Sequence, residues 1–292
     1  MSFSIFTDTS ANIPTPEAKK HQIGVIPLSY IVDGQSHVCL DTETFRCQEY
    51  YDALKAGTKI TTSQINPDRY VQSFEAAFQA GKDILFVGMS SGISGSFNSA
   101  RIASEQLLEE YSDRKVRLVD SLGASLGEGL LVLEAISCRE KGMPLDETAD
   151  YLEQMRARVY QLFTVDDLMF LRRGGRLSNA SALVGTVLNV KPLLKGNENG
   201  KIVSFEKVRG RKKVMEQLAS RYERLVVDAE NQIVCISHCS CLEDAQTLAE
   251  AIRKNHPPKD ILIVEHEPVT GSYLGPGALA LYFQGDKDVR TK

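Results

Sequence analysis

Apolar residues in the first half of the chain form short continuous runs that alternate with segments of helical spacing. Residues 84–90 form a short apolar run that predicts a strand, and residues 115–121 are predicted to form the next strand. The segment between them carries apolar side chains three or four positions apart, namely Phe97, Ala100, Ala103, Leu107, Leu108 and Tyr111. Further helices are predicted over residues 127–140 and 145–159. This order of strand, helix, strand and helix is typical of a parallel sheet.

The second half of the chain has a different pattern. An apolar run over residues 183–194 leads through Asn199-Gly200, a strong hairpin turn pair, into a strand over residues 201–208. The elements predicted after it are a basic helix (211–225), a strand (232–238), a helix (242–255), a strand (260–266) and a last β run (278–285).

We therefore expect an α/β protein with two domains. Residues 1–155 are predicted to form an N-terminal domain with a mainly parallel sheet between helices. Residues 156–292 are predicted to form a C-terminal α/β domain with a mixed or antiparallel sheet, and we expect the ligand between or beneath the two domains. A chain of 292 residues supplies enough core material for both.

The composition narrows the function classes. With 42% apolar and 25% charged residues, the chain has the make-up of a soluble globular protein. Its net charge of −4 argues against a nucleic-acid partner, because phosphate neutralisation needs an excess of Lys and Arg. The first residues do not resemble a signal peptide, and no apolar run approaches about 18 residues. We expect a cytoplasmic protein.

The cysteines suggest neither a disulfide scaffold nor a metal site. Six cysteines in a chain of this length are too few and too unevenly spread for a disulfide framework. Cys235, Cys239 and Cys241 lie close together with His238 between them, but no second ligand pair follows at zinc-finger spacing. We expect no metal, and we expect Cys235 to point into the core from a strand.

No common catalytic motif is present: the chain lacks the P-loop lysine motif, G-x-G-x-x-G, a nucleophile elbow and H-E-x-x-H. Hydroxyl-rich loops instead follow the predicted strands, where ligands bind in open α/β sheets. Residues 90–96 (SSGISGS) open a helix whose N–H groups favour an anion. Residues 61–67 (TTSQINP) offer three adjacent hydroxyls. Ordinary helix capping or a turn is the alternative for both loops.

Two further features are candidates for binding. Arg172, Arg173 and Arg176 surround two glycines, and this cluster suits a phosphate or an acidic protein surface. A solvated basic loop is the alternative, as is a structural clamp in which Asp166 and Asp167 pair with these arginines. His266 follows an apolar strand, where it could contact a carboxylate or phosphoryl group, although a lone histidine is more often structural.

Several segments together resemble the DegV family, whose members include the FakB-like fatty-acid-binding subunits of bacterial fatty acid kinase. The resemblance runs nearly end to end through short motifs in the expected order. These motifs are TDTSANIP at 7, TTSQINP at 61, SSGISGSFNSA at 90, VDS at 119, DDLMFLRRGGRLS at 166, KPLL at 191 and the GPGALAL run after His266. The chain departs from the family's usual T-S-Q-P, because Ile65 and Asn66 displace the proline by two positions.

The resemblance implies a lipid-binding protein that is not itself an enzyme and needs no cofactor. It implies a bound long-chain fatty acid whose carboxylate contacts Thr62, Ser94, Gly95 and His266. Arg172, Arg173 and Arg176 are implicated in partner docking or in head-group chemistry. The implied partner is a fatty acid kinase catalytic subunit that forms acyl phosphate for phospholipid synthesis, and the resemblance also allows transient contact with a membrane surface.

Two alternatives stay open at this stage: a stand-alone lipid carrier or sensor, and a small hydrolase or transferase that uses Ser94 or His266. Turnover by the isolated protein would favour the second alternative. The sequence does not assign the residues that line an acyl tunnel.

Overall fold

Parallel strands form the main sheet of the first compact unit in the computed structural model, which describes residues 3–178, 189–286 and 290. This unit comprises Met1–Phe45 and Ile60–Arg156. The sheet has the order β2-β1-β6-β7, and every neighbouring pair of strands is parallel. Its strands are β1 (Ser4–Asp8), β2 (Gly24–Ile26), β6 (Ile84–Gly88) and β7 (Val116–Asp120).

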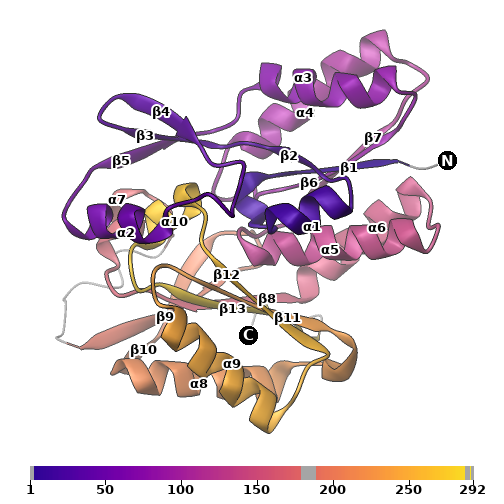
Figure 1. Cartoon of the computed structure of the whole chain (residues 1–292). Helices are drawn as coiled ribbons and strands as arrows, with labels where there is room; N and C mark the ends of the chain where they lie inside the picture. The colour runs from indigo at the N-terminus through magenta and orange to yellow at the C-terminus, as the bar shows by residue number, and fades with distance from the viewer. Residues whose placement is uncertain (1–2, 179–188, 287–289, 291–292) are drawn as a thin grey trace. The chain divides into compact units, whose positions relative to one another are not determined.

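Helices cover both faces of this sheet: α3 and α4 pack together on one face, and α5 and α6 pack on the other (Figure 1). The helices of this unit are η1 (Thr9–Ala11), α1 (Thr15–Lys20), α3 (Pro67–Gln79), α4 (Ser96–Glu110), α5 (Leu126–Glu140) and α6 (Leu145–Met155). Aromatic packing joins α3 to the sheet, because Phe74 contacts Phe6, Tyr70 and Phe86. The predicted parallel α/β/α arrangement is confirmed.

A second, smaller sheet in this unit was not predicted. Its strands are β3 (Ser29–Val32), β4 (Gln35–Val38) and β5 (Ile60–Ser63), and they pair antiparallel in the order β4-β3-β5. No residue of these strands is buried. Because no face of this sheet is buried, its strands do not need the alternation of apolar and polar positions that marks a half-buried strand in a sequence. Thr62 lies on β5 opposite Tyr30.

The second unit, Arg46–Lys59 with Ala157–Lys292, is built on a mixed sheet of order β10-β9-β8-β13-β11-β12. Its strands are β8 (Val159–Thr164), β9 (Val190–Gly196), β10 (Ile202–Arg209), β11 (Ile233–His238), β12 (Asp260–Glu265) and β13 (Leu279–Gln284). Only β11 and β12 pair parallel among these described strands. The hairpin through Asn199-Gly200 joins β9 to β10, as predicted, whereas residues 183–188 of the preceding apolar run lie outside the described residues.

Two long helices bury the core of this unit against one face of the sheet. Val214 and Leu218 of α8, with Leu248 and Ile252 of α9, pack against strand side chains such as Leu162. The helices of this unit are α2 (Cys47–Lys55), α7 (Met169–Arg173), α8 (Arg211–Leu225), η4 (Ala229–Asn231), α9 (Leu242–Asn255) and α10 (Pro268–Leu274). The short helix η2 (Arg156–Arg158) spans the boundary in the chain between the two units. None of the helices described in either unit is long and apolar enough to cross a membrane.

The segment that carries α2 packs with the second unit, although the sequence led us to expect it within residues 1–155. Tyr51 is the reason. Its ring is buried, its hydroxyl donates to the carbonyl of His266 over 2.9 Å, and it occupies the space that a Cβ would need at Gly271. Tyr50 adds a second bond from its hydroxyl to the carbonyl of Pro268, at 2.6 Å.

Candidate functional site

A buried aspartate at the end of β1 supports the serine-rich loop after β6. One carboxylate oxygen of Asp8 accepts from the backbone N–H of Ser10 at 2.8 Å, and the other accepts from the N–H of Met89 at 3.1 Å. Asp8 is 1% exposed. Because β1 and β6 are parallel neighbours, their carboxyl ends meet at one edge of the sheet, and Asp8 joins these two ends.

A second buried carboxyl, Glu128 of α5, lies beside Asp8. Thr7 donates to Glu128 at 2.8 Å, and the hydroxyl of Ser10 donates to its other oxygen. Burial, followed by the charge of Asp8, raises the pKa of Glu128 well above its usual range, and burial likewise raises the pKa of Asp8. The sequence analysis missed Glu128, whose only signal is a carboxyl in an otherwise small and apolar helical segment. Asp8 thus contacts the start of the serine-rich loop directly, and Glu128 binds the residues on either side of Asp8.

The first part of the serine-rich loop is held by its own contacts. Ser90 is fully buried, and its N–H donates to the carbonyl of Gly123 at 2.8 Å. The hydroxyl of Ser91 donates to Asp120 at 2.6 Å. These contacts tie the loop to the residues that follow β7, so both serines have structural roles.

Ser94 is half-buried and lies where the loop becomes α4. Its oxygen accepts from the backbone N–H of Ser96 at 3.2 Å, and its hydroxyl lies 3.0 Å from the hydroxyl oxygen of Ser96. Ser94 therefore binds the first N–H of α4, although the N-cap residue of this helix is Gly95. A hydroxyl can rotate its proton, so Ser94 can also donate to a ligand while it accepts from Ser96.

The two hydroxyl-rich loops contact each other within the first unit. The backbone N–H of Ile65 donates to the buried hydroxyl oxygen of Ser96 at 3.1 Å. The side-chain oxygen of Gln64 lies 2.1 Å from the position that a Cβ would take at Gly95. Gly95 is thus a close approach of backbone to side chain. The structure brings together the loop that follows Thr62 and the loop that carries Ser94 and Gly95.

The inserted Ile65 and Asn66 have clear structural roles. Ile65 is buried, and the side chain of Asn66 accepts from the N–H of Arg69 at 3.0 Å, which caps α3. Pro67 then occupies the first position of the helix, where its missing N–H costs nothing. The departure from T-S-Q-P therefore shapes the start of α3 and leaves Thr62 on β5.

His266 belongs to the second unit and is fully enclosed by hydrogen-bonding groups. Its Nε2 lies 2.7 Å from the hydroxyl of Ser237, and its Nδ1 lies 3.3 Å from the hydroxyl of Thr270. Ser237 in turn lies 3.1 Å from the hydroxyl of Tyr282. Burial, assisted by His238, lowers the pKa of His266 to about 3. A neutral imidazole with this pKa is a poor general base at neutral pH, which argues against a hydrolase built on Ser237 and His266.

The lowered pKa of His266 predicts acid sensitivity. An unfolded histidine binds a proton below about pH 6.5, whereas His266 in the folded protein binds one only near pH 3. The neutral form of His266 makes its full contribution to stability above about pH 6.5. This contribution is lost as the pH falls from about 6.5 to about 3. The unchanged protein should lose up to about 1.4 kcal/mol of unfolding free energy per pH unit through His266 as the pH falls from 6 to 4, whereas His266→Gln should not. The difference in unfolding free energy between the two proteins should therefore shrink by this amount. Urea denaturation at each pH measures this, and a constant difference would contradict it.

The clustered cysteines have structural environments. Cys235 is buried in β11, as predicted. The thiol of Cys241 donates to the carbonyl of Ala278 at 3.2 Å, and burial raises its pKa to about 11, so it carries little thiolate. Among the residues that the structure describes, no group of three or more His, Cys, Asp or Glu side chains is placed to hold a metal.

The arginine-glycine segment presents two of its three cations to solvent. Arg172 and Arg173 are exposed at the end of α7. Arg176 is instead half-buried, with its guanidinium 4.7 Å from the centre of the Tyr273 ring and one N–H donated to the carbonyl of Gly174 at 2.6 Å. Arg176 is thus a packing residue, and Arg172 and Arg173 form the accessible basic surface.

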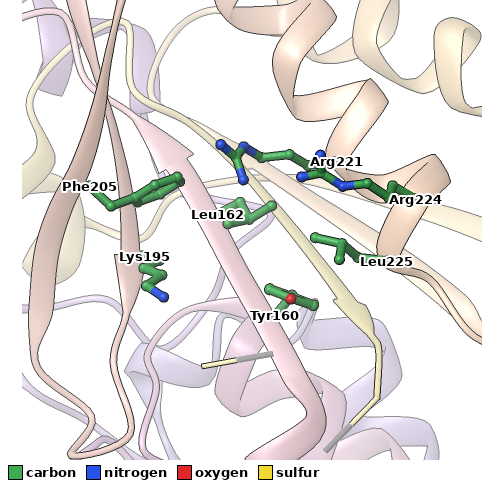
Figure 2. Close-up of a pocket in the computed structure, with 7 residues that line it drawn as sticks. All are labelled: Tyr160, Leu162, Lys195, Phe205, Arg221, Arg224 and Leu225. Atoms are coloured by element: carbon green, nitrogen blue, oxygen red, sulfur yellow. The ribbon is translucent and has the colours of Figure 1, made fainter. Parts of the chain in front are cut away.

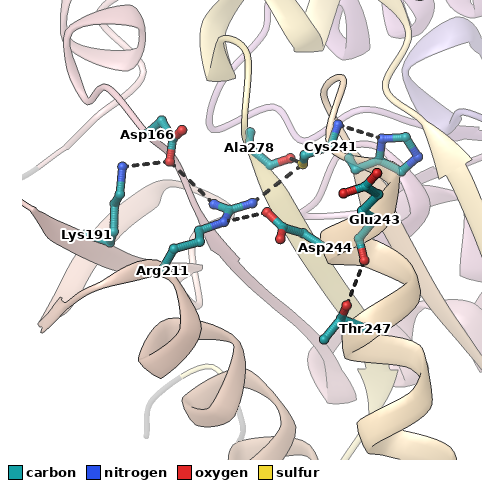
Figure 3. Close-up of polar contacts among 9 residues, drawn as sticks. Asp166, Lys191, Arg211, Cys241, Glu243, Asp244, Thr247 and Ala278 are labelled. Carbon is teal, nitrogen blue, oxygen red and sulfur yellow. Dashed lines mark hydrogen bonds and ion pairs between the residues drawn. The ribbon is translucent and has the colours of Figure 1, made fainter.

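The alternative in which Asp166 and Asp167 pair with these arginines is not seen in their described contacts, which are made with other groups. Asp166 accepts from Lys191 at 2.7 Å and lies 3.5 Å from Arg211 (Figure 3). Asp167 caps α7 by accepting from the N–H of Met169 at 2.8 Å. The cause is topology: β8 pairs with β9, which brings Lys191 closer to Asp166 than sequence distance suggests.

Comparison with known proteins agrees with this architecture along nearly the whole chain. The family model of the DegV family, described as uncharacterised proteins, matches residues 2–286. A DegV domain-containing protein of Clostridium perfringens is 39% identical over 284 residues, which cover 97% of this chain and 98% of that protein. A DegV domain-containing protein of Streptococcus pyogenes is 34% identical over 285 residues, which cover 98% and 99%.

Solved structures of similar fold include several fatty-acid-binding proteins. DegV of Bacillus subtilis, a fatty acid binding protein, is 31% identical with a TM-score of 0.83 and covers 98% of this chain and 100% of its own. A fatty acid binding DegV family protein of Streptococcus agalactiae is 30% identical with a TM-score of 0.86 and covers 98% and 99%. A DegV family protein of Thermus thermophilus with fatty acid binding is 26% identical, with a TM-score of 0.89 and coverage of 98% and 100%.

Proposed function

Because this chain belongs to the DegV family, we propose that it binds a long-chain fatty acid through its carboxylate and presents it to a separate ATP-dependent kinase. The observation that carries the proposal is the contact between the two hydroxyl-rich loops at the start of α4. The fatty acids bound by similar proteins supply the ligand class. In this proposal Thr62, Ser94 and Gly95 receive the carboxylate.

The acyl tail provides most of the affinity and the head group provides the orientation. Burial of a methylene contributes about 0.8 kcal/mol, so a chain of roughly 14 methylenes contributes about 10 kcal/mol before ordering costs are subtracted. A hydrogen bond to a charged acceptor contributes about 1.5–3 kcal/mol. The hydroxyls of Thr62 and Ser94 therefore fix where the carboxylate lies more than whether the lipid binds.

The contacts of Ser94 suit a carboxylate that must react. The hydroxyl of Ser94 donates to the buried hydroxyl oxygen of Ser96, and rotation of this proton would let Ser94 donate to the ligand carboxylate instead. Ser96 is then a positioning residue. Hydroxyls and helix N–H groups stabilise an anion without the tight ion pair that arginine forms, so a carboxylate oxygen keeps its nucleophilicity.

The partner kinase supplies the chemistry. One carboxylate oxygen attacks the γ-phosphorus of ATP, the bond from that phosphorus to the bridging oxygen breaks, and ADP leaves. The product is an acyl phosphate for phospholipid synthesis. We propose that exposed Arg172 and Arg173 dock an acidic surface of the kinase and that the system works in the cytoplasm. Both ring nitrogens of His266 are engaged by Ser237 and Thr270, so we propose that His266 affects the head group only indirectly, by ordering its own segment.

Gly95 tests the loop contact on which the proposal depends. In Gly95→Ala the new methyl group would lie 2.1 Å from the oxygen at the flexible end of the Gln64 side chain, so this side chain must move away and its contact with the Ser94 loop is lost. We expect roughly a two- to threefold weaker affinity of delipidated protein for a long-chain fatty acid, because this contact no longer helps to hold the two loops together. Isothermal titration calorimetry measures it.

Gln64→Ala provides the matched control. It removes the same contact without the collision, so it should weaken affinity to a similar extent, and the double variant should lose no more than either single variant. The corresponding fatty alcohol, which lacks the charge, should bind about tenfold more weakly than the acid to the unchanged protein. Equal affinities of acid and alcohol would show that the carboxylate is not recognised.

A further inference from the structure

A pocket lies within the second unit, on the face of the sheet that α8 covers (Figure 2). Its volume is about 190 Å³. Apolar side chains of two strands, β8 and β10, and of α8 supply part of the lining: Tyr160, Leu162, Phe205 and Leu225. Three cations supply the rest: Lys195, Arg221 and Arg224.

Lys195 occupies a position where the strand pattern calls for an apolar residue. It pairs with Leu162 of β8, and Leu193, two positions earlier on β9, belongs to the same core as Leu162. Residues two apart on a strand face the same way, so Lys195 points to the core side. It is only 9% exposed, and lysine is seldom so buried without a specific role.

A β-bulge shapes the opposite wall. The pairing of β10 with β9 passes from Ser204 directly to Glu206, which makes Phe205 the extra residue. The ring of Phe205 lies 4.7 Å from the guanidinium of Arg221 and 5.8 Å from the ammonium of Lys195. The bulge thus places an aromatic face between two cations.

Arg221 and Lys195 have more N–H donors than the acceptors described for them within this unit. Arg221 pairs with Glu206, yet its Nε–H is buried and has no hydrogen-bond partner among the described residues. Lys195 donates one of its three N–H groups to the carbonyl of Arg290 at 3.0 Å. An unsatisfied buried donor is costly, and an anion would satisfy it.

Glu206 pairs with Arg221 and leaves Lys195 and Arg224 as the other two cations of the pocket. Glu198 and Asp286 act on Lys195 and Tyr160 respectively, and neither is among the described residues that line the cavity. Burial and Asp286 raise the pKa of Tyr160 to about 12, so its phenol is a neutral hydrogen-bonding group. Arg224 is exposed, and no carboxylate in the described part of the chain pairs with it.

We propose that this pocket binds a small carboxylate anion with a single aromatic ring. The apolar walls and the bulged Phe205 receive the ring, and Lys195, Arg221 and Arg224 receive the carboxylate. The size fits this class, because an apolar cavity of about 150 Å³ accommodates benzene and the remaining space suits a carboxylate. Pockets for larger ligands usually exceed about 300 Å³.

Titration of the full-length protein with benzoate, followed by ¹H–¹⁵N NMR, tests the proposal. We expect saturable binding with a dissociation constant of about 1 mM or tighter, with shifts at Tyr160 and Phe205. Benzamide, the neutral analogue, should bind at least about tenfold more weakly. Binding should persist in fatty-acid-loaded protein, because none of the residues that line the pocket belongs to the proposed carboxylate loops.

Substitutions locate the anion. Lys195→Met should weaken benzoate at least about tenfold, and Arg224→Met, an exposed change that leaves the core intact, should weaken it severalfold. Lys207→Met removes a charge from an exposed position of β10 and should have no effect. Two results with the unchanged protein would overturn the proposal: no saturable binding of benzoate up to about 10 mM, or equal binding of benzamide. Unchanged affinity in Arg224→Met would also overturn it, as would NMR shifts that map to the Thr62 and Ser94 loops.

Discussion

Replacement of both Thr62 and Ser94 by alanine is expected to reduce acyl phosphate formation about 100-fold when the protein is combined with a fatty acid kinase subunit and ATP at subsaturating fatty acid. In the proposed binding mode, each lost hydroxyl removes a hydrogen bond to a charged acceptor, at about 1.5 kcal/mol or more, and about 1.4 kcal/mol corresponds to a factor of ten. The loss of orientation adds to this effect, because the carboxylate must lie in line with the γ-phosphorus.

The lipid content of this double variant should fall much less than its turnover, because the acyl tail provides most of the binding. Thr61→Ala is the matched control. Thr61 neighbours Thr62 on β5, and successive residues of a strand face opposite sides, so its loss should leave turnover unchanged. Thr62→Ser, which keeps a hydroxyl, should retain most of the activity. Unchanged turnover in the double alanine variant would exclude these hydroxyls from the site.

Tyr51→Ala is expected to cost about 3–5 kcal/mol of unfolding free energy, the largest stability effect that we predict. The ring of Tyr51 is 1% exposed, and its hydroxyl satisfies the carbonyl of His266. Truncation leaves both a cavity and an unpaired carbonyl. Chemical denaturation measures the loss.

Tyr51→Phe separates the two contributions. It keeps the ring and removes only the hydroxyl, so about 1–2 kcal/mol should be lost. Tyr30→Ala is a useful comparison, because Tyr30 lies on β3 of the small sheet and is not buried, so its truncation should cost less than Tyr51→Ala. A loss below about 1 kcal/mol in Tyr51→Ala would contradict the packing of α2 against the His266 segment.

The main sheets could be predicted because their signals are local. The run over residues 84–90 and the helical spacing that follows it identify β6 and α4 without knowledge of any distant residue. The hairpin at Asn199-Gly200 is likewise a local turn signal. The small sheet has no such signal, because β3, β4 and β5 contain no buried position.

Contacts between distant residues explain the other differences. Tyr51 and His266 are 215 positions apart, and nothing near residue 51 reveals that its ring packs in the second unit. Asp166 pairs with Lys191 and Arg211 because strand pairing brings them together, whereas sequence distance favoured the nearby arginines. Only the three-dimensional structure identifies Glu128 as a partner of Asp8 at the base of the serine loop.

The loops of the candidate site could be predicted from the sequence, but the contacts between them could not. The hydroxyl-rich loops at residues 61–67 and 90–96 were identified as ligand sites or caps, and the structure adds the bond from Ile65 to Ser96 and the close approach of Gln64 to Gly95. In the proposed function, the preferred acyl chain length would be set by side-chain packing, which periodicity does not encode.

Mass spectrometry of an organic extract from the purified protein tests the central claim most directly. The protein should carry a long-chain fatty acid at close to one molecule per chain, and delipidated protein should take up added fatty acid to the same ratio. Repeated absence of lipid from the extract, together with no uptake of added fatty acid, would contradict the account.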